Sequence, residues 1–286
     1  MKKLLILLLG LVILLTGCGP KEDELTKDVN KAIDAFITNY AQDYIKVGEE
    51  TVLNENVILA IKALQDNGYD VNLNDYASSE EVKAYFDGVE ITSMNAAYKA
   101  VLISRAFGIT SDKATTYLKG LTEDDVDVWS YTYGVIALNI TKVNKELKDA
   151  IVAKLNVIRD EDFRDADYAG YALIAASGMT LDRNPIYKLI NDNLTENGVQ
   201  SWGNANASVT ASVILGLIAD GKSPITEEYT TNDVNLVEAL LKYENEGAFV
   251  NVLAEDVDLM FATPQAFSAL VSYKLLAQGK PANIFA

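Results

Sequence analysis

Aromatic side chains recur at matching positions of the chain, where they could stack on a planar or ring-shaped ligand. Tyr98, Trp129 and Tyr168 each lie ten residues before a Gly or Asn that ends an apolar stretch. If those stretches are neighbouring helices, the three rings lie at one level of the molecule. Tyrosine suits a wall that is apolar but wet, because its ring packs while its hydroxyl forms hydrogen bonds. We therefore predict a central aromatic-lined cavity, with packing between helices as the alternative.

Polar side chains near these aromatics would orient the ligand. Asn204 and Gln265 both donate and accept hydrogen bonds through their amides, although either could instead cap a helix or form a turn. The predicted ligand-binding residues are Tyr98, Trp129, Tyr131, Tyr168, Trp202, Asn204 and Gln265. Further candidates for the same rim are Tyr133, Tyr171, Phe261 and Asn206.

The residue inventory removes most catalytic chemistries. The chain has no histidine and a single cysteine, so Ser-His-Asp and Cys-His catalysis are excluded. Two carboxylates across a cleft would suffice to hydrolyse a glycosidic bond. The candidates for that role are Asp127, Asp165 and Asp167. Since acids before helices usually cap free N–H groups, we predict no catalytic residue, with a carbohydrate-active hydrolase as the alternative.

One acid-rich segment could bind calcium, because oxygen ligands are dense there. It contains Asp160, Glu161, Asp162, Asp165 and Asp167. The segment lacks the alternating acidic spacing and the glycine of a calcium-binding loop. We therefore predict a solvated acidic face, no metal and no cofactor.

The charge of the chain limits its partners. It carries 41 acidic residues against 24 basic ones, for a net charge of −17. An acidic body is repelled by nucleic acid and by anionic lipid headgroups. We expect no nucleic-acid partner; a small molecule, a glycan or a surface protein remains open.

The first residues read as a targeting segment. Lys2 and Lys3 precede an apolar run over 4–15, which is too short to span a bilayer. Leu15-Thr16-Gly17-Cys18 then resembles the lipobox of bacterial lipoproteins. The resemblance implies a signal peptide at 1–17, a lipid on Cys18, a tether over 18–25, and an extracytoplasmic position on the bacterial cell membrane. An ordinary signal peptide is the alternative.

Internal repeats indicate the fold. Six stretches rich in small and aliphatic residues end at Gly or Asn, and Gly tolerates the left-handed conformation that ends a helix. After most of them comes a more amphipathic stretch, as at 144–158, 185–194 and 234–243. We predict one all-α domain over 26–286, an (α/α)6 toroid of six helical hairpins, with an open α-solenoid as the alternative. The six stretches are 57–67, 95–107, 129–138, 168–177, 208–220 and 264–278.

Turn sequences before two of these stretches favour the closed ring. Asn-Gly-Val-Gln-Ser-Trp-Gly at 197–203 and Asn-Glu-Gly-Ala-Phe at 245–249 resemble the repeats of squalene cyclases and protein prenyltransferases. Residues 262–270 resemble the last helix of bacterial surface proteins with such repeats. The zinc ligands of prenyltransferases, the Asp-x-Asp-Asp of class II terpene cyclases and the Cys-Gly-Glu-Gln of thioester domains are absent. From the lipobox and the missing catalytic residues we therefore predict a non-catalytic, surface-anchored ligand-binding module; a protein-binding scaffold or adhesin is a further alternative.

Overall fold

The computed structural model of the chain describes residues 23–157 and 166–286. These residues are mostly helical, with only short strands, as predicted. No helix among them is both long and apolar enough to cross a membrane. The predicted signal peptide and Cys18 lie outside the described residues, and the first described helix, α2 (Glu24–Asn39), begins inside the predicted tether.

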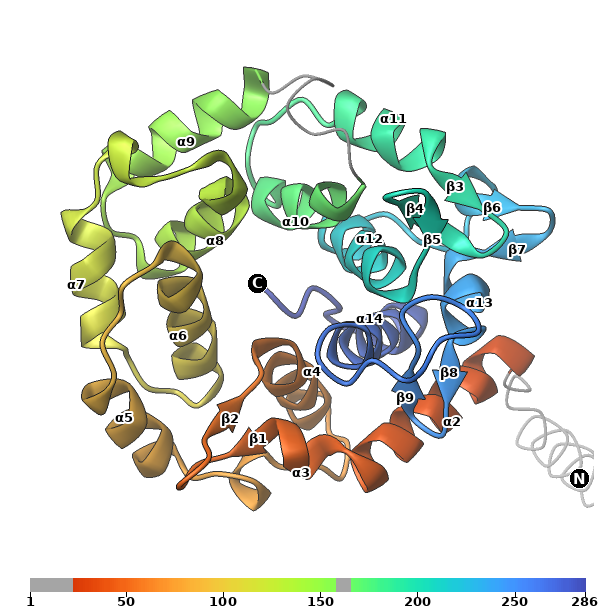
Figure 1. Cartoon of the computed structure of the whole chain (residues 1–286), viewed down its shortest axis with the longest axis horizontal. Helices are drawn as coiled ribbons and strands as arrows, with labels where there is room; N and C mark the ends of the chain where they lie inside the picture. Colours follow the sequence, from red (N-terminus) through yellow and green to blue (C-terminus); the bar gives the residue numbers. More distant parts are fainter. Residues whose placement is uncertain (1–22, 158–165) are drawn as a thin grey trace, which may run out of the picture.

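Six helices stand side by side in a ring around the centre of the molecule (Figure 1). Each packs against the next one along the chain, and the last packs against the first. These inner helices match the six predicted apolar stretches, with ends that differ by a few residues. They are α4 (Glu55–Asp66), α6 (Met94–Ala106), α8 (Tyr131–Thr141), α10 (Asp167–Ala176), α12 (Ala207–Ala219) and α14 (Ala262–Ala277).

A second set of helices covers the outside of the ring (Figure 1). Besides α2 it contains α5 (Ser79–Gly88), α7 (Asp112–Gly120), α9 (Lys145–Val157), α11 (Asn184–Asp192) and α13 (Leu236–Leu241). The inner helices are buried on most sides, whereas the outer ones bury only one face. This difference follows from the sequence, because a helix that is apolar all round must be covered on all sides.

Small residues let the inner helices approach closely. At Gly170 of α10, an added Cβ would lie 2.1 Å from the backbone oxygen of Ser212 in α12. At Gly216 of α12, an added Cβ would lie 2.5 Å from the backbone oxygen of Gly170. The two helices therefore contact each other backbone to backbone, which only glycine permits.

Short hairpins lead into several inner helices. Strand β2 ends just before α4, where the side chain of Asn54 caps the helix by accepting from the Val57 N–H. Asn206 caps α12 in the same way, after the β3–β4–β5 sheet. The remaining elements are α3 (Ala41–Tyr44), β1 (Ile45–Lys46), β2 (Val52–Leu53), β3 (Leu194–Thr195), β4 (Gly198–Ser201), β5 (Asn204–Ala205), β6 (Thr230–Thr231), β7 (Val234–Asn235), β8 (Glu244–Asn245), β9 (Ala248–Phe249), η1 (Leu73–Asp75), η2 (Glu123–Asp125), η3 (Val128–Ser130) and η4 (Glu227–Tyr229).

The C-terminal segment enters the centre of the ring (Figure 1). Arg105, in the last turn of α6, donates from Nη1 to the backbone oxygen of Phe285 at 3.1 Å. Asn283 donates from Nδ2 to Ser177 Oγ at 3.3 Å, just past the end of α10. Ile284 and Phe285 are buried. The segment thus fills the centre where the inner helices end and leaves the other end for the cavities described below.

Candidate functional site

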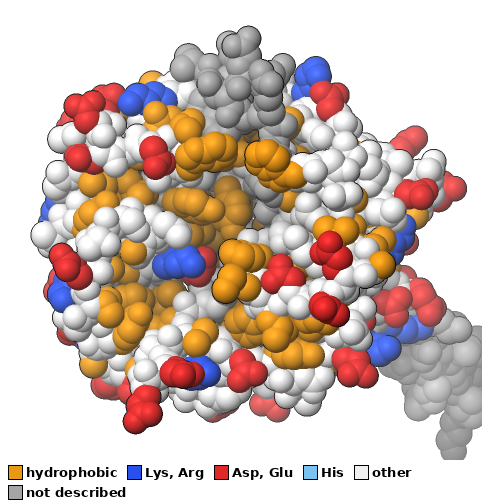
Figure 2. Space-filling view, in the orientation of Figure 1, with side chains coloured by type: hydrophobic (Ala, Val, Ile, Leu, Met, Phe, Trp, Pro, Cys, Tyr) orange, Lys and Arg blue, Asp and Glu red, His pale blue; other side chains and the backbone are white. Residues whose placement is uncertain are grey.

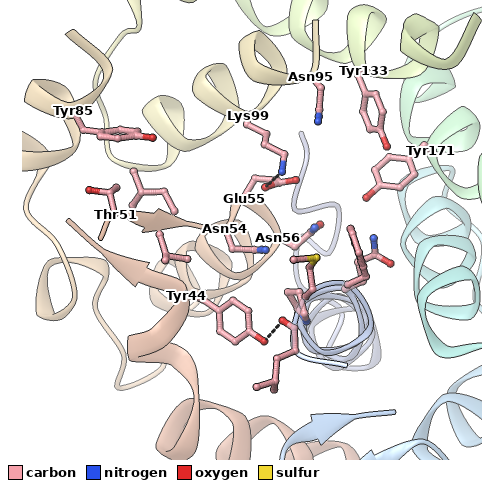
Figure 3. A pocket seen from close by; sticks show the side chains of 17 residues that line it. Tyr44, Thr51, Asn54, Glu55, Asn56, Tyr85, Asn95, Lys99, Tyr133 and Tyr171 are labelled. Atoms are coloured by element: carbon pink, nitrogen blue, oxygen red, sulfur yellow. Dashed lines mark hydrogen bonds and ion pairs between the residues drawn. The ribbon is translucent and has the colours of Figure 1, made fainter. Parts of the chain in front are cut away.

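A cavity of about 780 Å³ opens at the end of the ring where the inner helices begin. Figure 2 shows this face hollowed near its centre, with hydrophobic side chains around the hollow. Figure 3 shows side chains from several inner helices and from the β1–β2 hairpin pointing into it. Its lining includes Tyr44, Thr51, Asn54, Glu55, Asn56, Tyr85, Asn95, Lys99, Tyr133, Tyr171, Phe261 and Gln265.

Tyrosines from successive inner helices form one wall. The rings of Tyr133 in α8 and Tyr171 in α10 meet edge to face, with centroids 5.2 Å apart. Tyr98 of α6 packs against Tyr133 at 4.9 Å but is itself buried, behind the wall. Edge-to-face and tilted contacts of this kind hold rings in fixed positions. The wall therefore offers two partly exposed phenol rings, supported from behind by a third.

The floor holds an ion pair. Lys99 Nζ lies 3.4 Å from Glu55 Oε2, and the two side chains meet at the centre of Figure 3. The Glu55 side chain is 9% exposed and that of Lys99 is 43% exposed. Burying a carboxylate is unfavourable unless a counter-charge or hydrogen bonds compensate. Lys99 supplies the charge, and hydrogen-bonding capacity of Glu55 is left for a molecule in the cavity.

Two buried polar atoms near the cavity have no hydrogen-bond partner among the described residues, namely Asn56 Oδ1 and the Tyr98 hydroxyl behind the wall. Glu55 Oε2 likewise accepts no hydrogen bond there and has only its ion pair with Lys99. Burial, with smaller contributions from Tyr171 and Glu55, raises the pKa of Tyr98 well above its ordinary value, so the phenol stays protonated. Leaving a buried polar group unsatisfied costs about 1–3 kcal/mol. Unsatisfied buried groups are rare in folded proteins, so these atoms mark the surroundings of the cavity as unusual in their packing.

A second cavity of about 400 Å³ adjoins the first. Both are lined by the same Tyr133, Tyr171, Phe261 and Gln265. The second adds residues from the β4–β5 hairpin, from α12 and from the segment after β9, namely Trp202, Asn206, Ser208, Ser212 and Asn251. The two cavities are therefore neighbouring parts of one depression that share a wall.

The loop before α14 is held in place beside both cavities. The Asp258 carboxylate accepts from the backbone N–H groups of Met260 at 2.8 Å and Phe261 at 3.0 Å. The Tyr44 hydroxyl donates to the backbone oxygen of Leu259; burial, and secondarily Asp258, raises the pKa of this phenol. Phe261 is nevertheless 58% exposed. These hydrogen bonds hold the backbone of the loop in place. The loop thus presents the apolar side chain of Phe261 beside both cavities.

The structure brings only part of the predicted binding set together. Trp202 and Gln265 line the cavities, as do the secondary candidates Tyr133, Tyr171, Phe261 and Asn206. The other predicted residues lie outside the lining of both cavities. Tyr98 is buried behind the wall, Tyr131 and Tyr168 are half-buried, and Trp129 and Asn204 are exposed in η3 and β5.

The position of Trp129 has a clear structural cause. The sequence predicts that this helix ends at Asn139, and the position of Trp129 is derived from that end. In the structure, α8 continues to Thr141 and is capped by Lys142, which adopts the left-handed conformation with φ 56°. The helix also begins later than expected, at Tyr131, so Trp129 lies before it in η3. The expectation of three rings at one level is wrong for this residue, and Tyr133, further along α8, lines the cavity.

The predicted acids are not brought together by the described residues. Asp127 caps η3 by accepting from the Ser130 N–H at 2.9 Å, which is the structural alternative considered above. Asp167 is the first residue of α10, whereas Asp165 and the acidic residues 160–162 lie outside the described residues. Within 23–157 and 166–286 no group of His, Cys, Asp and Glu side chains could hold a metal ion.

Several lining residues escaped the sequence reasoning. Glu55 and Asn56 open an inner helix directly after a hairpin, as Asn206 does, and Lys99 is a charge inside an otherwise apolar stretch. One sequence signal could have identified Glu55 and Asn56 as lining residues. It is a polar residue at the start of a helix that is otherwise apolar on all sides. Comparison with family models and with curated proteins gives no match for this chain, so its function is inferred from the site itself.

Proposed function

We propose that this protein is a surface-anchored, non-catalytic binding module that holds a small molecule or glycan in its central cavity. We assign it an (α/α)6 toroid of six helical hairpins, of the squalene cyclase and prenyltransferase type. The cyclic packing order of the inner helices supports this assignment, as do the outer helices around them (Figure 1).

The cavity of about 780 Å³ is the observation that carries the proposal, since its volume falls within the range of small-molecule sites. Sugar rings stack their apolar C–H faces on aromatic side chains and direct hydroxyl groups outward. The cavity offers the phenol rings of Tyr133 and Tyr171 for the first role. The side chains of Asn56, Asn95 and Gln265 can form hydrogen bonds with those hydroxyl groups, because their amides form none with other described residues.

The carboxylate content favours binding over hydrolysis. Retaining and inverting glycosidases both need two carboxyl groups facing each other across the bond to be cleaved. Among residues 23–157 and 166–286, Glu55 is the one carboxylate in the lining of the two cavities, and it is paired with Lys99. We therefore assign Glu55 and Lys99 to the binding of polar ligand groups.

Calorimetric titration against a panel of neutral oligosaccharides tests the proposal. We expect saturable binding that Tyr171→Ala weakens by about 5- to 150-fold, because one wall of the cavity loses its ring, about 1–3 kcal/mol by analogy with ring-stacking sites. Trp129→Ala is the matched control: it also removes an aromatic ring, but one outside the cavities, and should leave the affinity unchanged. Equal effects of the two variants would contradict the proposed site, and cleavage of a bound probe would contradict its non-catalytic character.

The anchor is a separate part of the proposal. The lipobox-like Leu15-Thr16-Gly17-Cys18 supports lipidation at Cys18, and two acyl chains hold a protein stably to a bilayer where one does not. We expect Cys18→Ser to release the protein from the membrane fraction and to abolish incorporation of labelled fatty acid. Retention of label in this variant would exclude Cys18 as the site.

A further inference from the structure

The shared wall makes the two cavities a continuous depression with two ends. Thr51 and Tyr85 line it at one end, and Trp202 and Asn251 line it at the other. Tyr133, Tyr171, Phe261 and Gln265 belong to both parts. The first cavity alone has the size of a site for a small molecule. A ligand that contacts both ends must therefore be longer than one compact ring.

Trp202 occupies a backbone position that disfavours its side chain. Ser201 pairs with Asn204, which leaves Trp202-Gly203 as a two-residue hairpin loop with φ values of 53° and 90°. Such turns favour Asn-Gly, because left-handed residues with a bulky side chain are strained. The corresponding loops of the β6–β7 and β8–β9 hairpins are Asn232-Asp233 and Glu246-Gly247. Of these three hairpin loops, only the one beside the second cavity contains a tryptophan.

The exposure of Trp202 gives a second unfavourable feature. Its side chain is 82% exposed, so the ring gains little from burial in the protein. A residue that breaks the local turn preference and leaves its ring in solvent contributes nothing evident to stability. Local rules are expected to fail where function requires it, and this residue lies at the end of the depression.

Fixed amide groups lie beside this tryptophan. Asn251 Oδ1 accepts from the Ser208 N–H at 3.2 Å and from its hydroxyl at 2.8 Å. Asn206 Oδ1 accepts from the Val209 N–H at 2.9 Å as the cap of α12. Asn206 Nδ2 also donates to the backbone oxygen of Asn204 at 3.4 Å, whereas Asn251 Nδ2 donates to none of the described residues. These bonds orient both amides and leave Asn251 with a free donor. Oriented amides next to an exposed ring match a sugar residue, whose hydroxyl groups both donate and accept.

We propose that the depression binds a linear oligosaccharide, with one unit on the floor formed by Glu55, Asn56 and Lys99 and another stacked on Trp202. The inference rests on the proposed function and adds the length of the ligand and an outer subsite. The shared residues Tyr133, Phe261 and Gln265 contact the units between them. Affinity therefore rises with chain length until both ends of the depression are occupied.

The test is calorimetric titration of the full chain with four linear series, each from one to six units: cello-, malto-, xylo- and chito-oligosaccharides. We expect at least one series to bind, with affinity increasing at least tenfold between its shortest binding member and its hexamer. Trp202→Asn replaces the ring with the residue that the turn prefers. It should weaken hexamer binding at least tenfold, change binding of the shortest member less than twofold, and leave the melting temperature unchanged or higher.

Glu246→Asn is the matched control, since it alters the same first position of a hairpin loop away from the depression and should leave all affinities unchanged. The two-subsite inference would be overturned if affinity did not depend on chain length, or if Trp202→Asn left hexamer binding unchanged. The proposed function would still be tested separately by Tyr171→Ala. No binding by any series would overturn the oligosaccharide inference, while the first cavity could still bind another small molecule as the proposed function states. Selection of a displayed peptide that occupies the depression, with no sugar binding, would identify a polypeptide ligand and likewise overturn the inference.

Discussion

Tyr243 shows how one buried phenol makes the stability of the protein depend on pH. Its hydroxyl donates to the backbone oxygen of Asn197 at 2.7 Å, and burial raises its pKa from 10.0 to about 12. Above about pH 10 the unfolded chain loses this proton while the folded protein retains it. Protons then favour the folded state, so the stability contributed by Tyr243 is complete below about pH 10 and decreases as the pH rises toward about 12.

We predict that Tyr243→Phe is less stable than wild type near neutral pH by about 1 kcal/mol, the net value of a typical hydrogen bond. The difference should shrink and then reverse between about pH 10 and 12. Wild type alone loses up to about 1.4 kcal/mol per pH unit through this group. Urea denaturation of both proteins across this range measures the difference, and a constant gap would contradict the assigned burial of the phenol.

The residues of the site were predictable only where their position did not depend on a helix end. Trp202 and Gln265 were identified from residue type and from neighbouring turn or helix signals, and both line the depression. Trp129 was misplaced because the left-handed residue ending α8 is Lys142, a residue type that gives no such signal. A shift of three residues moves a side chain by about 4.5 Å along the helix axis, so a small error at the helix end placed the predicted ring before the first residue of α8.

At the scale of the helices, the contact between α10 and α12 depends on glycine. A Cβ at Gly170 would lie 2.1 Å from a backbone oxygen, and backbone cannot move without separating the helices. We predict that Gly170→Ala destabilises the protein by about 3 kcal/mol, at the upper end of overpacking effects. Urea denaturation followed by circular dichroism gives the value.

Gly134→Ala in α8 is the control for this prediction. Its added Cβ would approach the flexible end of Met94 at 3.1 Å, which can move aside. The gain in helix propensity from glycine to alanine, up to about 1 kcal/mol, offsets the remaining strain. We expect a change within about 1 kcal/mol of wild type; equal losses in the two variants would show that the α10–α12 contact is no closer than the others.

The inner helices were predictable because their apolar and small residues have helical spacing and end at residues that favour the left-handed conformation. Five of the six observed ends are followed by Gly with positive φ, and the sixth by Lys142. The strands were predictable only as short local pairs, since two to four residues carry no periodic pattern. The hairpins lead the chain into α4, α12 and α13, and β8–β9 precedes the loop before α14; these placements depend on packing that no local pattern specifies.

Over the whole molecule, the sequence left open whether the repeats close into a ring, because open and closed arrays share the same period. Contacts between residues far apart in the chain support the closed ring that we propose. Phe36 of α2 stacks on Phe267 of α14 with centroids 3.9 Å apart. Asn39 donates from Nδ2 to the backbone oxygen of Glu246 at 3.0 Å. An open array would leave these first and last elements apart.

A double-mutant cycle on Phe36 and Phe267 tests this closure in solution. Each single change to Ala should cost about 3–5 kcal/mol, because both rings are fully buried. If the rings touch, the double variant loses less stability than the sum of the single variants by about 1 kcal/mol or more, since the second change removes a contact already lost.

Phe86 in α5 is buried elsewhere in the ring and supplies the control. Phe36→Ala and Phe86→Ala should add within about 0.5 kcal/mol. Additivity of Phe36→Ala with Phe267→Ala as well would mean that the ends are not packed together, and it would favour the open solenoid over the toroid that we propose.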